Sequence, residues 1–297
     1  MEKLNLKITT EVDENAILAR IKDNPIAQSV IEKLNLSDEQ IKNNYEIINA
    51  YIEDNQHCFV CKSRNECKNS SKGMHYGLKI DEQGLLVNYI SICPYFVDYY
   101  KKEKNLIYTT FNKESVLDDS QKSFLFDNIQ LFGNRFVYQI TKLLKNEQTT
   151  GAFLKLTDSK LRLKLVQSLA NILLLSHKVM IIKFSDFVKE IKRDFKNYER
   201  IDYLDLAANS EVLIIDGLGN EAISSWSRDE VLLSILDNRL QNDKATILCS
   251  SYDLDELEKI YRLSANDELK VKQIIEKINI IKNSWGEILW KSKELLF

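Results

Sequence analysis

Apolar positions recur with two different spacings along the chain. In the N-terminal part they fall at helical spacing: a stripe from Ile41 to Ile52 follows the capping box Ser37–Gln40, and Pro25 stands at the first position of an earlier helix. We therefore predict that the N-terminal segment is helical. An apolar strand over 85–90, close to local glycines, then indicates a hairpin, and a further helix is predicted over 95–104.

Beyond about residue 110, helical stretches alternate with short continuous apolar runs. Such runs are typical of strands that are buried on both faces of a parallel sheet. The predicted strands are 151–156, 178–184, 212–215, 245–250 and 287–291. The predicted helices are 121–145, 161–175, 185–196, 228–240 and 267–280. This alternation predicts an α/β domain with helices on both faces of its sheet.

The composition adds few constraints to this picture. The chain has 297 residues, of which 44% are hydrophobic and 29% charged, and this suits a globular protein of two domains. A net charge of -3 excludes a global basic field of the kind that binds nucleic acid. We find neither an apolar run long enough to cross a bilayer nor a signal peptide, and so we expect a cytoplasmic protein without a membrane partner.

Four of the five cysteines are concentrated in one stretch, from Cys58 to Cys93. Cys58 and Cys61 form a C-x-x-C knuckle, which can present two thiolates to one tetrahedral ion. We predict Cys58, Cys61, His75 and Cys93 as the ligands of a structural Zn²⁺, with a set containing Cys67 instead of His75 as the alternative. A redox role for the knuckle is disfavoured, because no thioredoxin-like strand and helix surround it.

The cysteine-rich stretch and the alternating stretch predict two domains. We place a small helical, zinc-binding domain at 1–108 and the α/β domain at 109–297. No linker rich in proline or glycine marks this boundary.

The run from Val212 to Ile215 ends in a carboxylate, Asp216, which two glycines follow closely. In open α/β sheets, ligands bind at the carboxyl ends of the strands. In P-loop NTPases an acid at this point holds the Mg²⁺ of a bound nucleotide, the Walker B role. The simpler interpretation is a buried strand that ends in a solvated turn aspartate.

The order of these features resembles the bacterial primosomal helicase loaders of the DnaI type, which are AAA+ proteins with an N-terminal zinc-binding domain. The resemblance covers nearly the whole chain. Its most specific parts are the Cys58/Cys61/His75/Cys93 spacing, the segment Ser225–Val231 and the segment Phe187–Glu190.

The resemblance implies a fold, partners and cofactors. It implies a P-loop NTPase-like parallel sheet for the second domain, with ATP and Mg²⁺ as ligands and single-stranded DNA as a further ligand. It implies that the zinc-containing domain binds the replicative DnaB-type helicase. A homo-oligomer, or an assembly templated by the helicase ring, is compatible with the family.

The phosphate loop departs from the family pattern. It falls on Leu156–Leu163, where the glycines that let backbone amides approach phosphates are missing. Ser159 stands at one of these glycine positions. Arg162 takes the place of the phosphate-binding lysine, and Leu163 takes that of the Mg²⁺-binding hydroxyl, which a leucine cannot replace.

Other nucleotide-binding positions depart as well. Gly217 replaces the second Walker B acid, Tyr252 replaces a polar sensor residue, and Gln273 and Lys277 stand where the family has arginines. Several losses around one ligand predict that ATP binding is absent, or weak and without hydrolysis. Asp216 is then expected to be the remnant of a metal-holding acid with little left to hold.

Three hypotheses follow for the function. The first is a DnaI-like helicase loader with a degenerate nucleotide site, which acts as an adaptor. The second is an active AAA+ ATPase in which Arg162 and Asp216 suffice. The third is a zinc-dependent interaction module without a role in replication.

Overall fold

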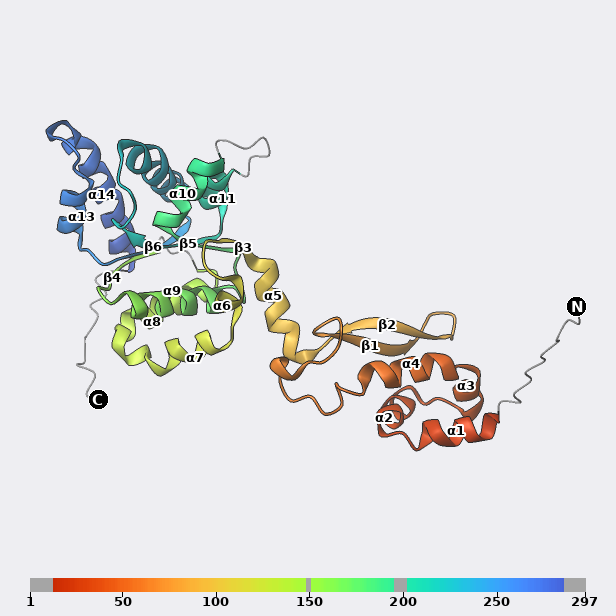
Figure 1. The fold of residues 1–297 in the computed structure, drawn as a ribbon. Coiled ribbons are helices and arrows are strands. Elements are labelled where there is room, and N and C mark those ends of the chain that lie inside the picture. Colours follow the sequence, from red (N-terminus) through yellow and green to blue (C-terminus); the bar gives the residue numbers. More distant parts are fainter. Residues whose placement is uncertain (1–12, 148–150, 195–201, 286–297) are drawn as a thin grey trace, which may run out of the picture. The chain divides into compact units, whose positions relative to one another are not determined.

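The chain folds into two compact units, Met1–Asp98 and Tyr99–Phe297. The computed structural model in Figure 1 describes residues 13–147, 151–194 and 202–285. Within these residues no helix is long and apolar enough to cross a membrane.

The described part of the first unit, from residue 13 on, consists of four helices and a hairpin, in agreement with the helical prediction. Its elements are α1 (Glu14–Lys22), α2 (Pro25–Leu34), α3 (Asp38–Asn43), α4 (Tyr45–Asn55), β1 (Met74–Ile80) and β2 (Leu86–Ile92), with short 3₁₀ turns η1 (Arg64–Glu66) and η2 (Pro94–Phe96). The strands pair antiparallel, and Leu78 and Leu86 join the core that the helices form. The predicted capping box is present at Ser37, but its helix ends at Asn44, whose φ of -121° and ψ of 23° interrupt the stripe.

The second unit is built on a parallel sheet, as predicted, and this sheet has five strands among the described residues. In the order in which they pair, the strands are β3 (Leu106–Thr109), β5 (Val179–Lys183), β6 (Val212–Leu218), β7 (Ala245–Ser250) and β4 (Gly151–Lys155). The short edge strand β3 was not predicted. The predicted strand at 287–291 lies outside the described residues.

Alternating residues of the central strands enter two separate cores. In β6, Val212 and Ile214 pack on one face of the sheet, whereas Leu213 and Ile215 pack on the other. The first face is covered by α6 (Lys113–Leu117), α7 (Ser120–Asp127), α8 (Ile129–Leu144) and α9 (Ser159–Leu173) (Figure 1). The second is covered by α10 (Phe184–Asp194), α11 (Tyr203–Asn209), the π-helical η3 (Trp226–Leu233), α12 (Ser234–Gln241), α13 (Leu254–Tyr261) and α14 (Glu268–Trp285), and the 3₁₀ turn η4 (Ala265–Asp267) precedes α14.

Two details of this unit differ from prediction. The single helix expected over 121–145 is divided into α7 and α8 at Asn128, whose side chain donates to the Phe124 carbonyl. The division between the units falls after Asp98, earlier than the predicted boundary at 108. The reason is that the end of α5 (Val97–Asn105) packs with the second unit: Lys102 is buried there and donates to Asn171 at 2.7 Å.

Candidate metal centre and nucleotide site

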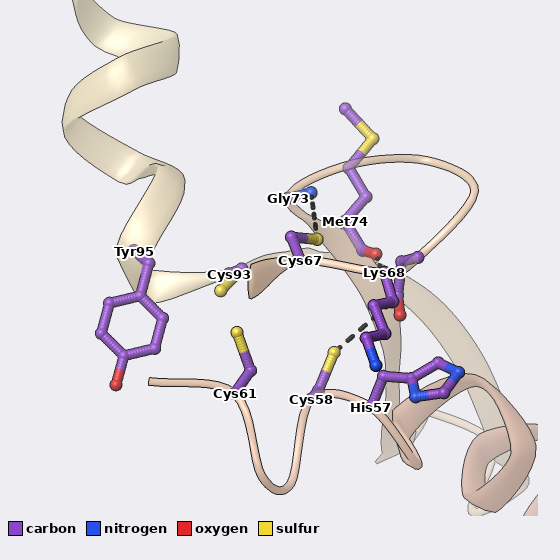
Figure 2. Close-up of a pocket in the computed structure, with 10 residues that line it drawn as sticks. His57, Cys58, Cys61, Cys67, Lys68, Gly73, Met74, Cys93 and Tyr95 are labelled. Atoms are coloured by element: carbon purple, nitrogen blue, oxygen red, sulfur yellow. Dashed lines mark hydrogen bonds between the residues drawn. The ribbon is translucent and has the colours of Figure 1, made fainter. Parts of the chain in front are cut away.

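Four cysteines of the first unit face one small cavity. Cys58 and Cys61 come from the loop after α4, Cys67 follows η1, and Cys93 stands between β2 and η2. Their sulfur atoms line a cavity of about 30 Å³, and Figure 2 shows them turned toward its centre from opposite sides. A cavity of this size has room for a single ion and excludes an organic cofactor.

Hydrogen bonds orient three of these sulfurs. Cys58 Sγ accepts from the Asn69 side chain at 3.4 Å, and Cys67 Sγ accepts from the Gly73 amide at 3.4 Å. Cys61 Sγ donates to the Ser63 carbonyl at 3.1 Å. The two bonds that sulfur accepts, at Cys58 and Cys67, are of the kind that orients metal ligands, whereas the Cys61 bond needs a protonated thiol.

The donor chemistry fits zinc, although the sulfurs are not closed around an ion. Four thiols match a structural Cys₄ set. Within the part of the chain that the structure describes, no three His, Cys, Asp or Glu side chains lie close enough to share one metal. Burial raises the pKa of the Cys58 thiol, and the neighbouring Cys93 and Cys67 raise it further, against the opposing bond from Asn69. A cation bound by the Cys58 thiolate would have to displace the proton of this thiol.

His75, which we predicted as a ligand, does not line the cavity. It lies in β1 next to Met74, which does line it, and successive side chains of a strand point to opposite faces. Its Nδ1 is 3.1 Å from the Tyr76 carbonyl oxygen. The alternative set with Cys67 therefore fits this structure better than the set with His75.

In the second unit, two of the four predicted nucleotide-site residues are brought together and two are not. Arg162 and Asp216 meet at the carboxyl edge of the sheet, and each side chain is 7% exposed. Ser159 and Leu163 lie on the outer side of α9 and are exposed. Neither of these two residues contributes to the buried site.

The Arg162 guanidinium is held by three groups. Its Nε donates to Asp216 Oδ1 at 2.5 Å. Its Nη1 donates to the Leu156 carbonyl at 2.9 Å and to Ser251 Oγ at 2.7 Å. The partner of Asp216 in the structure is therefore a side chain of the same chain, and the prediction that this acid no longer holds a metal stays a prediction.

The amides at the start of α9, where a phosphate would bind, are also satisfied from within. Asp158 is the N-cap of this helix, and its carboxylate accepts from the amides of Lys160 at 2.8 Å and Leu161 at 3.1 Å. These bonds hold the pKa of Asp158 below its ordinary value. Its negative charge lies beside the amides of the first helical turn, where it disfavours a phosphate group.

Burial and pairing have opposite effects on Asp216. Burial raises the pKa of its carboxyl, and the Arg162 guanidinium opposes this rise. The next residue, Gly217, has φ of 78°, a left-handed conformation that favours glycine over the acid that the family has there.

Two further arginines of this unit are fully buried. Arg228 is paired with Asp229 and Asp267, and it also donates to the Tyr261 carbonyl at 3.0 Å. Arg239 donates to backbone carbonyls that include those of Ala207, at 2.7 Å, and Ala245, at 2.6 Å. Both arginines thus connect elements inside the fold.

A buried acid lies close to the same edge. Glu221 follows β6, and its Oε2 accepts from the Gly219 amide at 2.8 Å. Its Oε1 and the Tyr261 hydroxyl are buried, and neither finds a hydrogen-bond partner among the described residues. Burial raises the pKa of Glu221, and burial together with Glu221 raises that of Tyr261.

The sequence reasoning missed the partners of Arg162. Ser251 and the Leu156 carbonyl lie 89 and 6 positions away from it along the chain. One feature of the sequence could have indicated this contact: Arg162 stands where the family pattern has the phosphate-binding lysine, and Asp216 is retained. Opposite charges at two positions that are adjacent in this fold can bind each other.

The comparisons with known proteins agree with the resemblance. No family model matches the sequence. The replicative helicase loader DnaI of Bacillus subtilis (strain 168) is 25% identical over 289 residues, which cover 94% of this chain and 88% of DnaI. The chain is a homologue of DnaI.

Three solved structures show a lower similarity to this DnaI homologue. A crystal structure of DnaI has 20% identity and a TM-score of 0.48, and the match covers 62% of this chain and 94% of that one. A putative primosome component from Streptococcus pyogenes serotype M3 has 18% identity and a TM-score of 0.44, over 61% and 91% of the two chains. The DnaC helicase loader has 23% identity and a TM-score of 0.39, over 48% and 85%.

Proposed function

We propose that this DnaI homologue is a helicase loader that acts as an adaptor and does not hydrolyse ATP. The observation that carries the proposal is the similarity to DnaI, which extends over 94% of the chain and so includes both units. The absence of ATP hydrolysis is supported by the carboxyl edge of the sheet. There Asp216 binds the Arg162 guanidinium, and Asp158 accepts from the amides at the start of α9, so the groups that would bind phosphates are already engaged.

In this proposal the first unit binds the replicative DnaB-type helicase, and zinc holds that unit together. Cys58, Cys61, Cys67 and Cys93 would be the ligands, and a Cys₄ zinc leaves no open position for chemistry. Large apolar side chains are exposed near the cavity and along the hairpin, at Phe59, Val60, Tyr76, Ile90 and Ile92. Apolar groups in such a number on one small unit are typical of a protein-binding surface.

In this proposal the second unit performs its part of the adaptor role without binding and hydrolysing ATP. Leu163 offers no oxygen to Mg²⁺, and Asp216 is occupied by Arg162. A triphosphate approaching this edge would be repelled by the exposed carboxylate of Asp158, and the charge of Arg162 that could attract it is already neutralised by Asp216.

Contact with single-stranded DNA also belongs to the proposal, on the basis of the resemblance alone. The basic residues of α10 are partly neutralised: Lys189 pairs with Asp186, and Arg193 pairs with Glu190. Lys192 lies over the Trp226 ring, 5.1 Å from its centroid. We expect binding to be weak and to fall steeply with salt, because few phosphates can be neutralised.

Co-purification with the replicative helicase from the same organism tests the proposal. We expect the full chain to retain the helicase equally well with and without ATP and Mg²⁺. Cys58→Ser should abolish retention, whereas Arg262→Ala, which removes an exposed arginine of the second unit, should not.

The same experiment separates the alternatives. Retention that requires ATP would favour an active AAA+ ATPase with a divergent phosphate loop. Absence of retention by the zinc-loaded chain would contradict the loader and favour a zinc-dependent adaptor outside replication.

A further inference from the structure

The groups around Arg162 come from three neighbouring strands. In the sheet, β6, β7 and β4 are neighbours in this order: Asp216 lies two residues before the end of β6, and Ser251 and Leu156 directly follow the ends of β7 and β4. Arg162 itself stands in the first turn of α9. One guanidinium therefore connects a helix with the carboxyl ends of three adjacent strands.

We infer that the Asp216 carboxylate, the Leu156 carbonyl and the Ser251 hydroxyl form a guanidinium-binding site that the chain fills with its own Arg162. The filled site stabilises this edge of the sheet in place of an external ligand. This inference deepens the proposed function and rests on it for the statement that no nucleotide is needed.

The chemistry of the site selects a guanidinium over other cations. Its three acceptors are a carboxylate oxygen, a carbonyl oxygen and a hydroxyl oxygen, each within 2.9 Å of a guanidinium nitrogen. A planar fork can reach acceptors in different directions with fixed geometry, whereas an ammonium is a compact charge on a flexible stem. We therefore name this group of three acceptors the guanidinium site.

Because Asp216 and Arg162 are both buried, each charge needs the other as its counter-charge. Both side chains are almost fully removed from solvent, and Cys249, which precedes Ser250 on the adjacent strand, is a buried thiol. Lys183, the register partner of Asp216 on β5, has its ammonium 3.4 Å from Asp186 and an exposed side chain. Without Arg162, the Asp216 carboxylate would be left in the interior without a counter-charge in contact.

The removal of the arginine side chain should leave a vacant site that a small guanidinium can enter. We would record thermal unfolding of the full chain, zinc-loaded, for the unaltered protein and for Arg162→Ala. The matched control is Arg262→Ala, because Arg262 also pairs with an acid but is 42% exposed. The probes are methylguanidinium, methylammonium, and ATP with Mg²⁺, each at low millimolar concentration.

Arg162→Ala should lower the melting temperature of the second unit by roughly 6–20 °C, because it breaks a buried ion pair. Methylguanidinium should restore part of this loss in a saturable manner, and methylammonium should not. The unaltered chain and Arg262→Ala should respond to neither cation. A melting temperature of Arg162→Ala equal to that of Arg262→Ala, or no difference between the two cations, would overturn the inference.

A measurement on the unaltered chain covers the case in which Arg162→Ala does not fold. The Nε–H signal of Arg162, assigned by comparison with Arg162→Lys, should exchange slowly with water and stay in place when ATP and Mg²⁺ are added. Fast exchange would contradict the guanidinium site. Saturable stabilisation of the unaltered chain by ATP and Mg²⁺ would instead contradict the proposed nucleotide independence, so the two failures can be told apart.

Discussion

The cysteine cavity of the first unit and the guanidinium site of the second differ in how their polar groups are satisfied. The four thiols face a common space and make only weak bonds to sulfur, so an ion can still unite them. The guanidinium site is already closed by a short ion pair. Both regions lie at positions where the resemblance to the helicase loaders implies a ligand, and the comparison shows that a matching position does not establish a vacant site. Whether a site can take an external ligand depends on whether the chain's own side chains already satisfy its polar groups.

The largest expected effect is on the cysteine cavity. Removing zinc with a chelator should unfold the first unit, because a structural zinc contributes on the order of 10 kcal/mol to the folding of a small domain. Circular dichroism and amide NMR spectra of the full chain should show loss of the first unit while signals from the second persist. Unchanged spectra after complete zinc removal would contradict the claim that the cysteine cavity, unlike the guanidinium site, needs an external ion.

The ligand set can be decided by zinc content. Cys67→Ser should lose bound zinc as Cys58→Ser does, whereas His75→Asn should retain it, since His75 does not line the cavity. Full zinc in Cys67→Ser together with loss in His75→Asn would restore the set predicted from sequence.

The second largest effect concerns Arg162 and Asp216. Arg162→Met and Asp216→Asn should each destabilise the second unit by about 3–5 kcal/mol, because each leaves a buried partner unpaired. The double variant should lose clearly less than the sum of the two, as measured by urea unfolding. Additive losses would show that the two side chains are not coupled.

These two sites also show what the sequence could and could not predict. The parallel sheet and the core strands followed from continuous apolar runs such as that of β6, since burial on both faces leaves this pattern. The breaks at Asn44 and Asn128 could not be predicted, because the apolar spacing continues across both residues. The short strand β3 has too few residues for a pattern, and its place depends on pairing with β5.

The candidate sites were predictable to different degrees. Cys58 and Cys61 were predicted from their local C-x-x-C spacing and Cys93 as part of a distant second pair, whereas the choice between Cys67 and His75 depends on which face of β1 meets the cavity. The contact between Arg162 and Asp216 joins residues 54 positions apart and depends on the rotamer of a long side chain. The sequence alone therefore identified Arg162 and Asp216 as candidate site residues but did not predict that they contact each other.

A smaller effect is expected from the buried acid Glu221. Because burial raises its folded pKa, this group contributes stability that is present below its unfolded pKa and is lost as the pH rises through the folded pKa. Glu221→Gln should therefore be more stable than the unaltered chain at neutral pH, by on the order of 1 kcal/mol. The difference in melting temperature should shrink as the solution is acidified, and a difference that grows instead would have the wrong sign.

The smallest effect is expected for an exposed ion pair at the same edge of the sheet. Lys155, at the end of β4, pairs with Asp253 and Glu256, but its side chain is 40% exposed. Lys155→Ala should change the stability of the second unit by less than about 1 kcal/mol in urea unfolding. A loss of stability as large as that of Arg162→Met would contradict the claim that burial makes the Arg162 ion pair more important for stability than the exposed Lys155 pair.

Titration calorimetry of the zinc-loaded full chain with ATP and Mg²⁺ tests most directly whether the nucleotide site is filled from within. We predict no saturable heat at micromolar to low millimolar nucleotide, for the unaltered chain and for Arg262→Ala alike. Saturable binding at micromolar ATP that requires Mg²⁺ would contradict this prediction, because it would require Arg162 to leave Asp216.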